Sequence, residues 1–340
     1  MIDLALALDC WPPQLFSRPL HHLLNELSPV VSYPVMDSDN AIELLGDLRQ
    51  RLLHWQQQIK EERAGTLREL FMAGNFEKAA DHFLSEIDQD GSSDEDRDIA
   101  AWSLTISANQ LLKKARRIDS KKAKILLKEA SEKYDQALNI KADLHAALSN
   151  WGNCLMQQAR LSISPTEATS LFVLAESKYM KALTIKPKRL ETLNNLGNLF
   201  YERASRAVGD HAIGLFKQAA KMYKSALKIK PDQQETLSNF GCLLMELSKS
   251  TRGKQRNRLL AEARAKLVAS RTINPAKTYN LACLAGLQGD EAECQLNLEN
   301  SEQQGTLPAV EHLRTNPDLD FIRDKLWFKQ LVEREASRSI

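Results

Sequence analysis

Apolar residues in the middle of the chain recur at the spacing of helices that bury one face. Leu148, Trp151 and Leu155 follow a helical period, and Ala175 and Tyr179 do the same farther along. This pattern predicts two successive amphipathic helices, each with its apolar side turned towards a neighbour.

The predicted helix pair is repeated along the chain. The first helix carries the motif Leu-x-Asn-x-Gly three times, with glycines 45 and 44 residues apart, and the second carries Tyr-x-x-Ala-Leu-x-Ile-Lys at the same spacing. Two independent landmarks with one period predict an array of helix pairs. The landmarks are Gly152, Gly197, Gly241, Tyr134, Tyr179 and Tyr223.

These glycines lie inside predicted helices, where a glycine costs about 1 kcal/mol relative to alanine. We therefore expect each of them to allow the close approach of a second helix. Pro187, Pro231 and Pro275 follow the second helix of successive pairs. A proline cannot continue a helix, so these prolines predict the ends of the units.

The repeat resembles the tetratricopeptide repeat (TPR) family over roughly residues 60–300. The resemblance is strongest in two central units, weaker in a third, and partial before and after them. It implies an all-α fold, a right-handed α-solenoid of antiparallel helix pairs. The matching residues are Leu148, Gly152, Ala175, Tyr179, Ala182 and Pro187; Leu193, Gly197, Ala219, Tyr223, Ala226 and Pro231; and Leu237, Gly241, Ala263, Leu267, Ser270 and Pro275.

The units exceed the usual TPR period of 34 residues by about ten. We expect the additional residues to lengthen both helices. Ser164, Pro165 and Glu167 have the order of an N-cap, a first-turn proline and a capping-box acid. They predict a second helix over 165–186, about 33 Å long. An irregular loop of ten residues is the alternative.

The N-terminal part differs from the repeats. Residues 1–39 hold five of the eleven prolines and are predicted to be irregular. Residues 40–98 are predicted to form an acidic helical head with an amphipathic helix over 40–62 and one TPR-like hairpin around Gly74. The seven acids between residues 86 and 98 indicate a linker or exposed loop.

The repeats are predicted to form a solenoid over residues 99–300, followed by a C-terminal capping region over 301–340. The segment 316–323, together with Trp327, Phe328 and Leu331, resembles the ending common in bacterial TPR-type proteins. Such an ending would supply a helix that covers the last apolar face of the array.

The net charge of the 340 residues is only +2, but it is divided unevenly. Residues 1–100 contain 8 basic and 19 acidic side chains, and the rest of the chain carries a net charge of +13. This predicts an acidic head that folds back onto a basic body or docks on a neighbouring molecule. No apolar run is long enough to insert into a membrane, and the apolar start lacks a basic flank, so a cytoplasmic location is expected.

The sequence lacks the usual motifs of catalytic chemistry. It contains no GxxxxGK[ST], GxSxG or HExxH, and its five cysteines are widely spaced. His21 and His22 are adjacent and would point apart on a helix, and Arg97 stands where a calcium loop from Glu86 needs a glutamate. We expect reduced thiols, no enzymatic activity, no cofactor and no metal.

Asparagines recur beside the small residue of each first helix. The TPR resemblance implies that these positions face a concave groove and contact the backbone of a partner peptide, since an amide both donates and accepts hydrogen bonds. The alternative is that they bond to neighbouring helices and set the geometry between repeats. Some TPR proteins bind a C-terminal carboxylate with lysines beside such asparagines, but this sequence has no lysine directly before Asn150, Asn195 or Asn239. The set is Asn109, Asn150, Asn153, Asn194, Asn195, Asn198, Asn239 and Asn280.

A second candidate surface is basic. Several cations lie eight or nine residues after the small residue, and we call the set the basic edge. Compensation of the helix dipole explains one cation per helix but not their density. The ligand would be an acidic protein segment or nucleic acid, and missing aromatic residues make nucleic acid the less favoured of the two. The basic edge comprises Lys113, Lys114, Arg116, Arg117, Arg160, Arg206, Lys249 and Arg252.

These features predict a scaffold or adaptor whose groove holds a segment of another protein. The basic edge would allow that segment to be acidic. Binding of nucleic acid or another polyanion by the basic edge is the first alternative. Self-assembly, through the end repeats or the acidic head, is the second.

Overall fold

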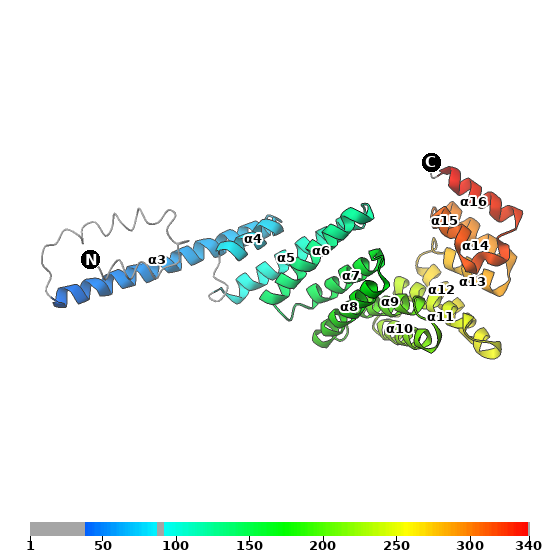
Figure 1. The fold of residues 1–340 in the computed structure, drawn as a ribbon, viewed down its shortest axis with the longest axis horizontal. Coiled ribbons are helices and arrows are strands. Elements are labelled where there is room, and N and C mark those ends of the chain that lie inside the picture. Colours follow the sequence, from blue (N-terminus) through cyan, green and yellow to red (C-terminus); the bar gives the residue numbers. More distant parts are fainter. Residues whose placement is uncertain (1–37, 87–91, 339–340) are drawn as a thin grey trace. The chain divides into compact units, whose positions relative to one another are not determined.

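The computed structural model describes residues 38–86 and 92–338. The predictions for residues 1–37, including Cys10 and the two adjacent histidines, lie outside these residues. Within them, all regular elements are helical (Figure 1). The elements are α3 (Ser38–Met72), α4 (Phe76–Glu86), α5 (Asp94–Ala115), α6 (Ser120–Ile140), α7 (His145–Leu161), α8 (Pro165–Ile185), α9 (Leu190–Ser205), α10 (Gly209–Ile229), α11 (Gln234–Lys249), α12 (Gly253–Ile273), α13 (Tyr279–Gln288), α14 (Glu291–Gln303), α15 (Val310–Thr315), the 3₁₀ helix η3 (Pro317–Ile322) and α16 (Leu326–Arg338).

The chain divides into two compact units, residues 1–66 and 67–340. In the first unit, the helix predicted over 40–62 lies within α3, which is longer at both ends. No proline interrupts the sequence from Ser38 to Met72, so nothing stops the helix at residue 62. An ion pair between Arg51 and Asp47, one turn apart, supports it.

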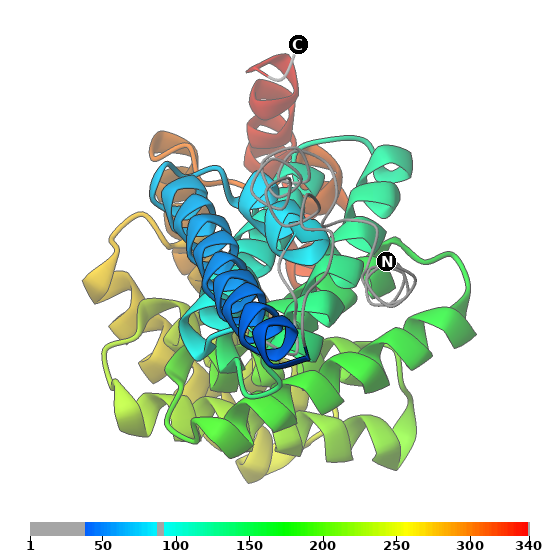
Figure 2. The ribbon, with the colours of Figure 1, turned by 90° about the vertical axis from the view of Figure 1, so that its left-hand side faces the viewer.

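The second unit is built of antiparallel hairpins. We call α5, α7, α9, α11 and α13 the A helices, and α6, α8, α10, α12 and α14 the B helices. Each A helix packs on its own B helix and also contacts the next A helix, whereas consecutive B helices have no comparable contact. The A helices therefore form the inner layer, and the hairpins turn progressively from one to the next (Figure 2). This is an all-α solenoid, as predicted.

The additional residues of each unit lengthen the helices. Helices α7 and α8 have 17 and 21 residues, together more than the usual 34-residue period. Only residues 162–164 connect them. The Ser164 hydroxyl accepts from the Glu167 N–H at 3.3 Å, and α8 begins at Pro165 as the capping pattern predicts. The alternative of an irregular ten-residue loop is wrong.

Two of the helix glycines leave room for a buried aromatic ring of the opposing helix, and we call each such contact position a glycine seat. A Cβ on Gly152 would lie 2.5 Å from the ring of Tyr179, and a Cβ on Gly197 would lie 2.5 Å from the ring of Tyr223. In both pairs the glycine belongs to the A helix and the tyrosine to the B helix of one hairpin. Both tyrosines are almost completely buried. The predicted close crossing is confirmed, and the ring contact sets its distance.

Two predicted boundaries fall inside helices. The acids at 94–98, expected in a linker, lie at the start of α5, three of them in its first turn. Ser93 caps the helix by accepting a hydrogen bond from the Asp96 N–H. Acidic side chains stabilise a helix N-terminus, so a dense acidic run there favours a helix start. The solenoid thus begins before residue 99, and its last hairpin ends at Gln303, beyond residue 300.

The C-terminal residues cover the end of the array. Segment η3 packs against α13, and α16 packs against α14. Leu319, Ile322 and Leu331 are fully buried. Arg334 forms a two-pronged pair with Glu302 at 2.8 Å, which joins α16 to the end of α14. The region therefore caps the last apolar face, as predicted.

The glycine seat gives a first prediction. Replacing Gly152 with alanine places a methyl group against the Tyr179 ring, and we expect the overpacking to destabilise the protein by about 1–3 kcal/mol. Gly214→Ala is the matched control, because Gly214 also lies within a helix but has open space at its Cβ position. The control should stabilise by up to about 1 kcal/mol. Urea unfolding followed by circular dichroism measures both, and equal effects would contradict the seat.

Candidate partner-binding surface

The A helices carry in-register polar residues on one helical stripe. These residues lie one, five and eight places after the small residue, so they share a face of the helix. We call the surface made by these stripes the inner surface. Its members are Asn109 and Lys113 on α5, with Arg116 as the C-cap of that helix; Asn153, Gln157 and Arg160 on α7; Asn198, Glu202 and Ser205 on α9; and Cys242, Glu246 and Lys249 on α11.

On α5, α7 and α9, the first residue of the stripe accepts a hydrogen bond from the buried tyrosine of the same hairpin. Tyr134 donates to Asn109 Oδ1 at 2.6 Å, Tyr179 to Asn153 at 2.6 Å, and Tyr223 to Asn198 at 2.7 Å. Burial raises the pKa of all three phenols, so they stay protonated and able to donate. In the hairpins of Tyr179 and Tyr223, one side chain thus both packs against the helix glycine and orients an amide on the inner surface.

Asparagines of the next repeat extend this arrangement across hairpins. Asn150 donates to Asn109 Oδ1 at 2.9 Å, and Asn239 donates to Asn198 Oδ1 at 2.9 Å. We call these tyrosine and asparagine contacts the Tyr–Asn ladder. The oxygens of the ladder amides are therefore engaged within the protein. Through these oxygens the asparagines bond to neighbouring helices, as the alternative prediction for them states.

The Nδ2 groups of Asn109, Asn153 and Asn198, unlike their oxygens, are not used in hydrogen bonds to described residues. None of the three donates to an acceptor in the part of the chain that the structure describes, and the three residues remain partly exposed. An oriented amide with unused N–H groups suits a backbone carbonyl of a partner. Contact between these asparagines and a ligand stays a prediction.

The remaining predicted asparagines lie in different environments. Asn194 is buried, donates to Glu235 at 3.2 Å and accepts from Thr236 at 3.0 Å, so it joins α9 to α11. Asn280 donates to Ser238 at 2.9 Å, which joins α13 to α11. Asn195 is partly buried and has no side-chain hydrogen bond with a described residue.

A polar hollow of about 260 Å³ opens between α11 and α13. It contains two of the predicted asparagines and receives one residue from the segment after α14. Amides, hydroxyls and one residue of each charge line most of it, so it would accept polar groups. The lining includes Gln234, Glu235, Ser238, Asn239, Lys277, Tyr279, Asn280 and Thr306.

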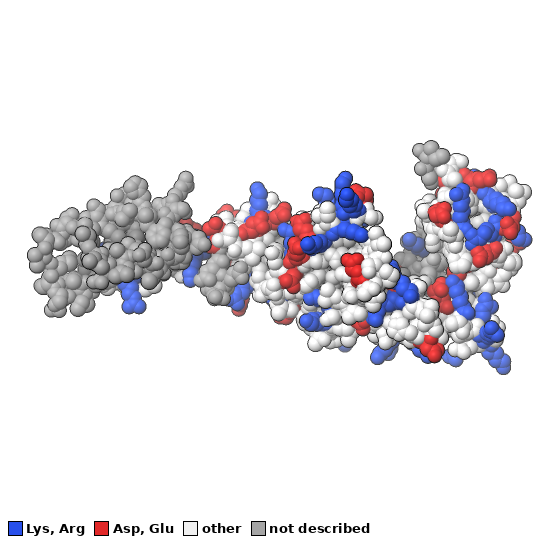
Figure 3. All heavy atoms as spheres, viewed as in Figure 1, with Lys and Arg blue, Asp and Glu red and all other residues white. Residues whose placement is uncertain are grey.

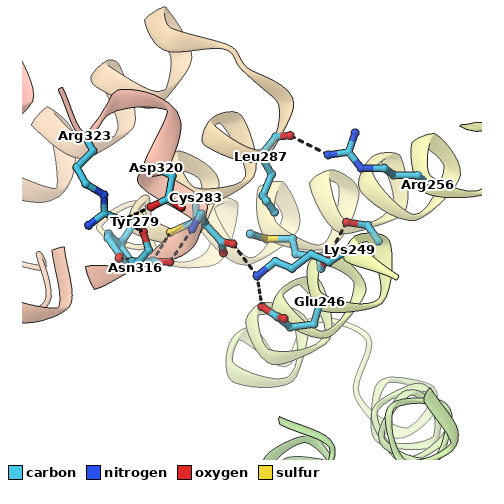
Figure 4. Close-up of polar contacts among 12 residues, drawn as sticks. Glu246, Lys249, Arg256, Tyr279, Cys283, Leu287, Asn316, Asp320 and Arg323 are labelled. Carbon is cyan, nitrogen blue, oxygen red and sulfur yellow. Dashed lines mark hydrogen bonds and ion pairs between the residues drawn. The ribbon is translucent and has the colours of Figure 1, made fainter. Parts of the chain in front are cut away.

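The C-terminal segment occupies the last part of the inner surface (Figure 4). The Asn316 amide donates to the Tyr279 hydroxyl at 2.7 Å and to Cys283 Sγ at 3.4 Å. Cys283 lies one place after Ala282, in register with the ladder asparagines. The Asp318 carbonyl approaches Gly286 so closely that a Cβ there would lie 2.2 Å away. The sequence did not predict that this segment enters the surface.

The same segment supplies a carboxylate to the basic edge. Lys249 Nζ lies 2.7 Å from Asp318 and 2.6 Å from Glu246 (Figure 4). Burial alone would lower the pKa of Lys249, but the hydrogen bonds to Asp318 and Glu246 outweigh it and raise the pKa. Burial, with Asp318 and Glu246 adding to it, also raises the pKa of the nearby Cys242 thiol to about 12.

The other members of the basic edge are divided between paired and open positions. Arg160 Nε donates to both carboxylate oxygens of Glu202 on the next A helix, at 2.9 and 3.0 Å, and Arg160 Nη2 also donates to Glu202 Oε1. Arg206 lies over the ring of Phe172 at 5.3 Å. The remaining five are exposed, and no ion pair joins them to a described residue: Lys113, Lys114, Arg116, Arg117 and Arg252. Basic side chains gather at the tips of the α5–α6 and α11–α12 hairpins (Figure 3).

Among the residues that the structure describes, no group of three or more histidine, cysteine, aspartate or glutamate side chains is arranged to hold a metal ion. No helix there combines the length and apolar character needed to cross a bilayer.

The ladder gives a second prediction. Asn198→Ala removes the acceptor of both Tyr223 and Asn239, and leaving such groups unpaired should destabilise the protein by about 2 kcal/mol. Asn195→Ala, three residues away on the same helix, removes no such bond and should change stability by less than about 0.5 kcal/mol. Urea denaturation of the two variants measures the difference. If both lose the same stability, the Tyr–Asn ladder is not a stabilising network.

Comparison with known proteins gives one match to a family model and several solved structures of similar fold. The family model of the plant-specific mitochondrial import receptor subunit TOM20 matches residues 210–304. No curated protein sequence matched significantly.

Many solved structures have a similar fold, and three of them share 16% identity with this chain. TTC0263, a thermophilic TPR protein of Thermus thermophilus, has a TM-score of 0.43 over 66% of this chain and 99% of its own. PilF of Pseudomonas aeruginosa has 0.46 over 71% and 91%. YrrB, described as a TPR protein with an unusual peptide-binding site, has 0.39 over 68% and 92%.

The repeat type therefore rests on features of the chain itself. The repeated landmarks, the paired helices and the aromatic ring seated on a helix glycine occur together in successive units. The bacterial character of the ending stays a prediction. Residues 94–303 form a solenoid of tetratricopeptide-type repeats with lengthened helices.

Proposed function

We propose that this protein is a non-enzymatic scaffold that binds an extended segment of another protein along its inner surface. The observation that carries the proposal is the set of in-register amides of Asn109, Asn153 and Asn198. The oxygen of each is held by a buried tyrosine, and the N–H groups remain available.

The chemistry suits a polypeptide backbone. Each amide can donate to a carbonyl oxygen of a partner without reading its side chain, so recognition would tolerate different sequences. The tyrosine contact orients the amide before the partner arrives, which lowers the entropy cost of binding. Specificity would come from the side chains between the amides and from charge.

The family match agrees with this proposal at a coarser level. The model over residues 210–304 describes a receptor subunit of mitochondrial import, and its span includes α11 and α13, which line the polar hollow. We propose that this region also receives polypeptide, in the cytoplasm of the cell.

The two alternatives are less well supported. The basic edge is not one continuous polyanion site, because Arg160 and Lys249 are paired with carboxylates of the same chain. Self-assembly through the last repeat is disfavoured because the C-terminal cap covers its apolar face, with Leu319 and Ile322 buried there.

Site-specific crosslinking in cells tests the proposal. A photoreactive amino acid replaces Gln157 of the inner surface or Asn195, which lies one turn before the inner-surface residue Asn198 on α9. The matched control replaces Lys181 on the exposed side of α8. Mass spectrometry of the adducts then identifies the crosslinked peptide. We expect segments of other proteins at positions 157 and 195, and little adduct at 181. Equal adducts at all three positions, or adducts at 181 alone, would contradict binding along the inner surface.

A further inference from the structure

The charges of the inner surface change along the array. The fifth and eighth places of the stripe are Lys113 and Arg116 on α5, Gln157 and Arg160 on α7, Glu202 and Ser205 on α9, and Glu246 and Lys249 on α11. The formal charge of these two places is thus +2, +1, −1 and 0 in order. A surface whose charge changes in this way favours one of the two directions in which a charged partner segment can bind along it.

Carboxylates of the chain neutralise the eighth-place cation on two helices. Arg160 of α7 pairs with Glu202, the fifth-place residue of the next A helix. On α11, the next A helix has Leu287 at the fifth place, and Asp318 of the C-terminal segment supplies the carboxylate to Lys249 instead. Arg160 therefore takes its carboxylate from the neighbouring A helix, whereas Lys249 takes one from Glu246 on its own helix and a second from a segment lying on the inner surface.

Arg116, the C-cap of α5, is the equivalent cation, and its expected partner position on α7 holds the neutral Gln157. Lys113, one turn earlier on the same stripe, adds a second positive charge. Both are exposed, and neither forms an ion pair with a residue between 38 and 86 or between 92 and 338. The nearby Asp119 is occupied in capping α6 and pairing with Lys122.

Arg116 also lies near the Tyr–Asn ladder. Burial raises the pKa of Tyr134 and Tyr179, and the charge of Arg116 acts against that rise in both. These tyrosines donate to Asn109 and Asn153, so the charge of Arg116 acts on the two hydroxyls that orient amides which the proposed function assigns to a partner backbone.

We propose that Lys113 and Arg116 form a carboxylate-binding site at the α5 end of the inner surface, which takes an Asp or Glu of an acidic partner segment. The proposal rests on the proposed function and specifies the chemistry of its partner. Asp318 on Lys249 shows the same contact made within the chain. Two cations on one carboxylate give charge-assisted hydrogen bonds, which are stronger than neutral ones.

Peptide binding to the full chain tests the site. The probes are fluorescein-labelled twelve-residue peptides of alternating Asp and Ala, Asn and Ala, or Lys and Ala, followed by fluorescence anisotropy. The acidic peptide should bind the wild type more tightly than the neutral one does. Lys113→Glu with Arg116→Glu should weaken acidic-peptide binding by about tenfold or more and should allow the Lys peptide to bind.

Lys114→Glu with Arg117→Glu is the matched control. It makes the same change of charge in the same segment but off the stripe, and it should alter acidic-peptide binding by less than about twofold. Circular dichroism verifies that both variants fold. Equal losses in the two variants, or no binding of the acidic peptide to the wild type, would overturn the proposal. A single-stranded DNA probe that binds more tightly and is lost equally in both variants would assign the cations to nucleic acid. The crosslinks at 157 and 195 do not depend on partner acidity, so they report separately on the proposed function.

Discussion

The structure depends on one contact, a buried aromatic ring seated on a glycine inside the opposing helix. The seats at Gly152 and Gly197 remove the Cβ that would otherwise meet Tyr179 or Tyr223. The cost of a glycine within a helix, about 1 kcal/mol, is offset by burial of a whole tyrosine ring. The contact fixes how closely the two helices of a hairpin approach, and its repetition sets the geometry of the array.

The same side chain connects the core to the surface. The tyrosine hydroxyl reaches the asparagine that begins the exposed stripe, so the orientation of each surface amide is set by core packing. In the next repeat Leu267 takes the tyrosine position and Cys242 the asparagine position. A leucine cannot donate a hydrogen bond, and the amide is replaced together with its donor. The inner surface there contains Glu246, Lys249 and the C-terminal segment instead.

The sequence predicted the features that are local or periodic. The helix pairs, the lengthened α8 with its cap at Ser164, and the close approach at the glycines all follow from spacing and propensity. The sequence also shows that the tyrosine and asparagine positions change together, to Leu267 and Cys242 in the third unit. This joint change indicates a contact between the two positions. The entry of segment 316–323 into the inner surface could not be read, because it depends on where a distant segment returns in space. The pairing of Arg160 with Glu202 likewise depends on how one hairpin stacks on the next.

These long-range contacts decide which part of the inner surface is left for a partner. At the α13 end, Asn316 and Asp318 satisfy Tyr279 and Lys249, and the buried Leu319 and Ile322 anchor the segment as part of the core. A partner would have to break that core to bind there. At the α5 end the amide of Asn109 and the charge of Arg116 have no such occupant among the described residues. Because one end is filled and the other is open and basic, an extended partner would lie in one direction, with its acidic part towards α5.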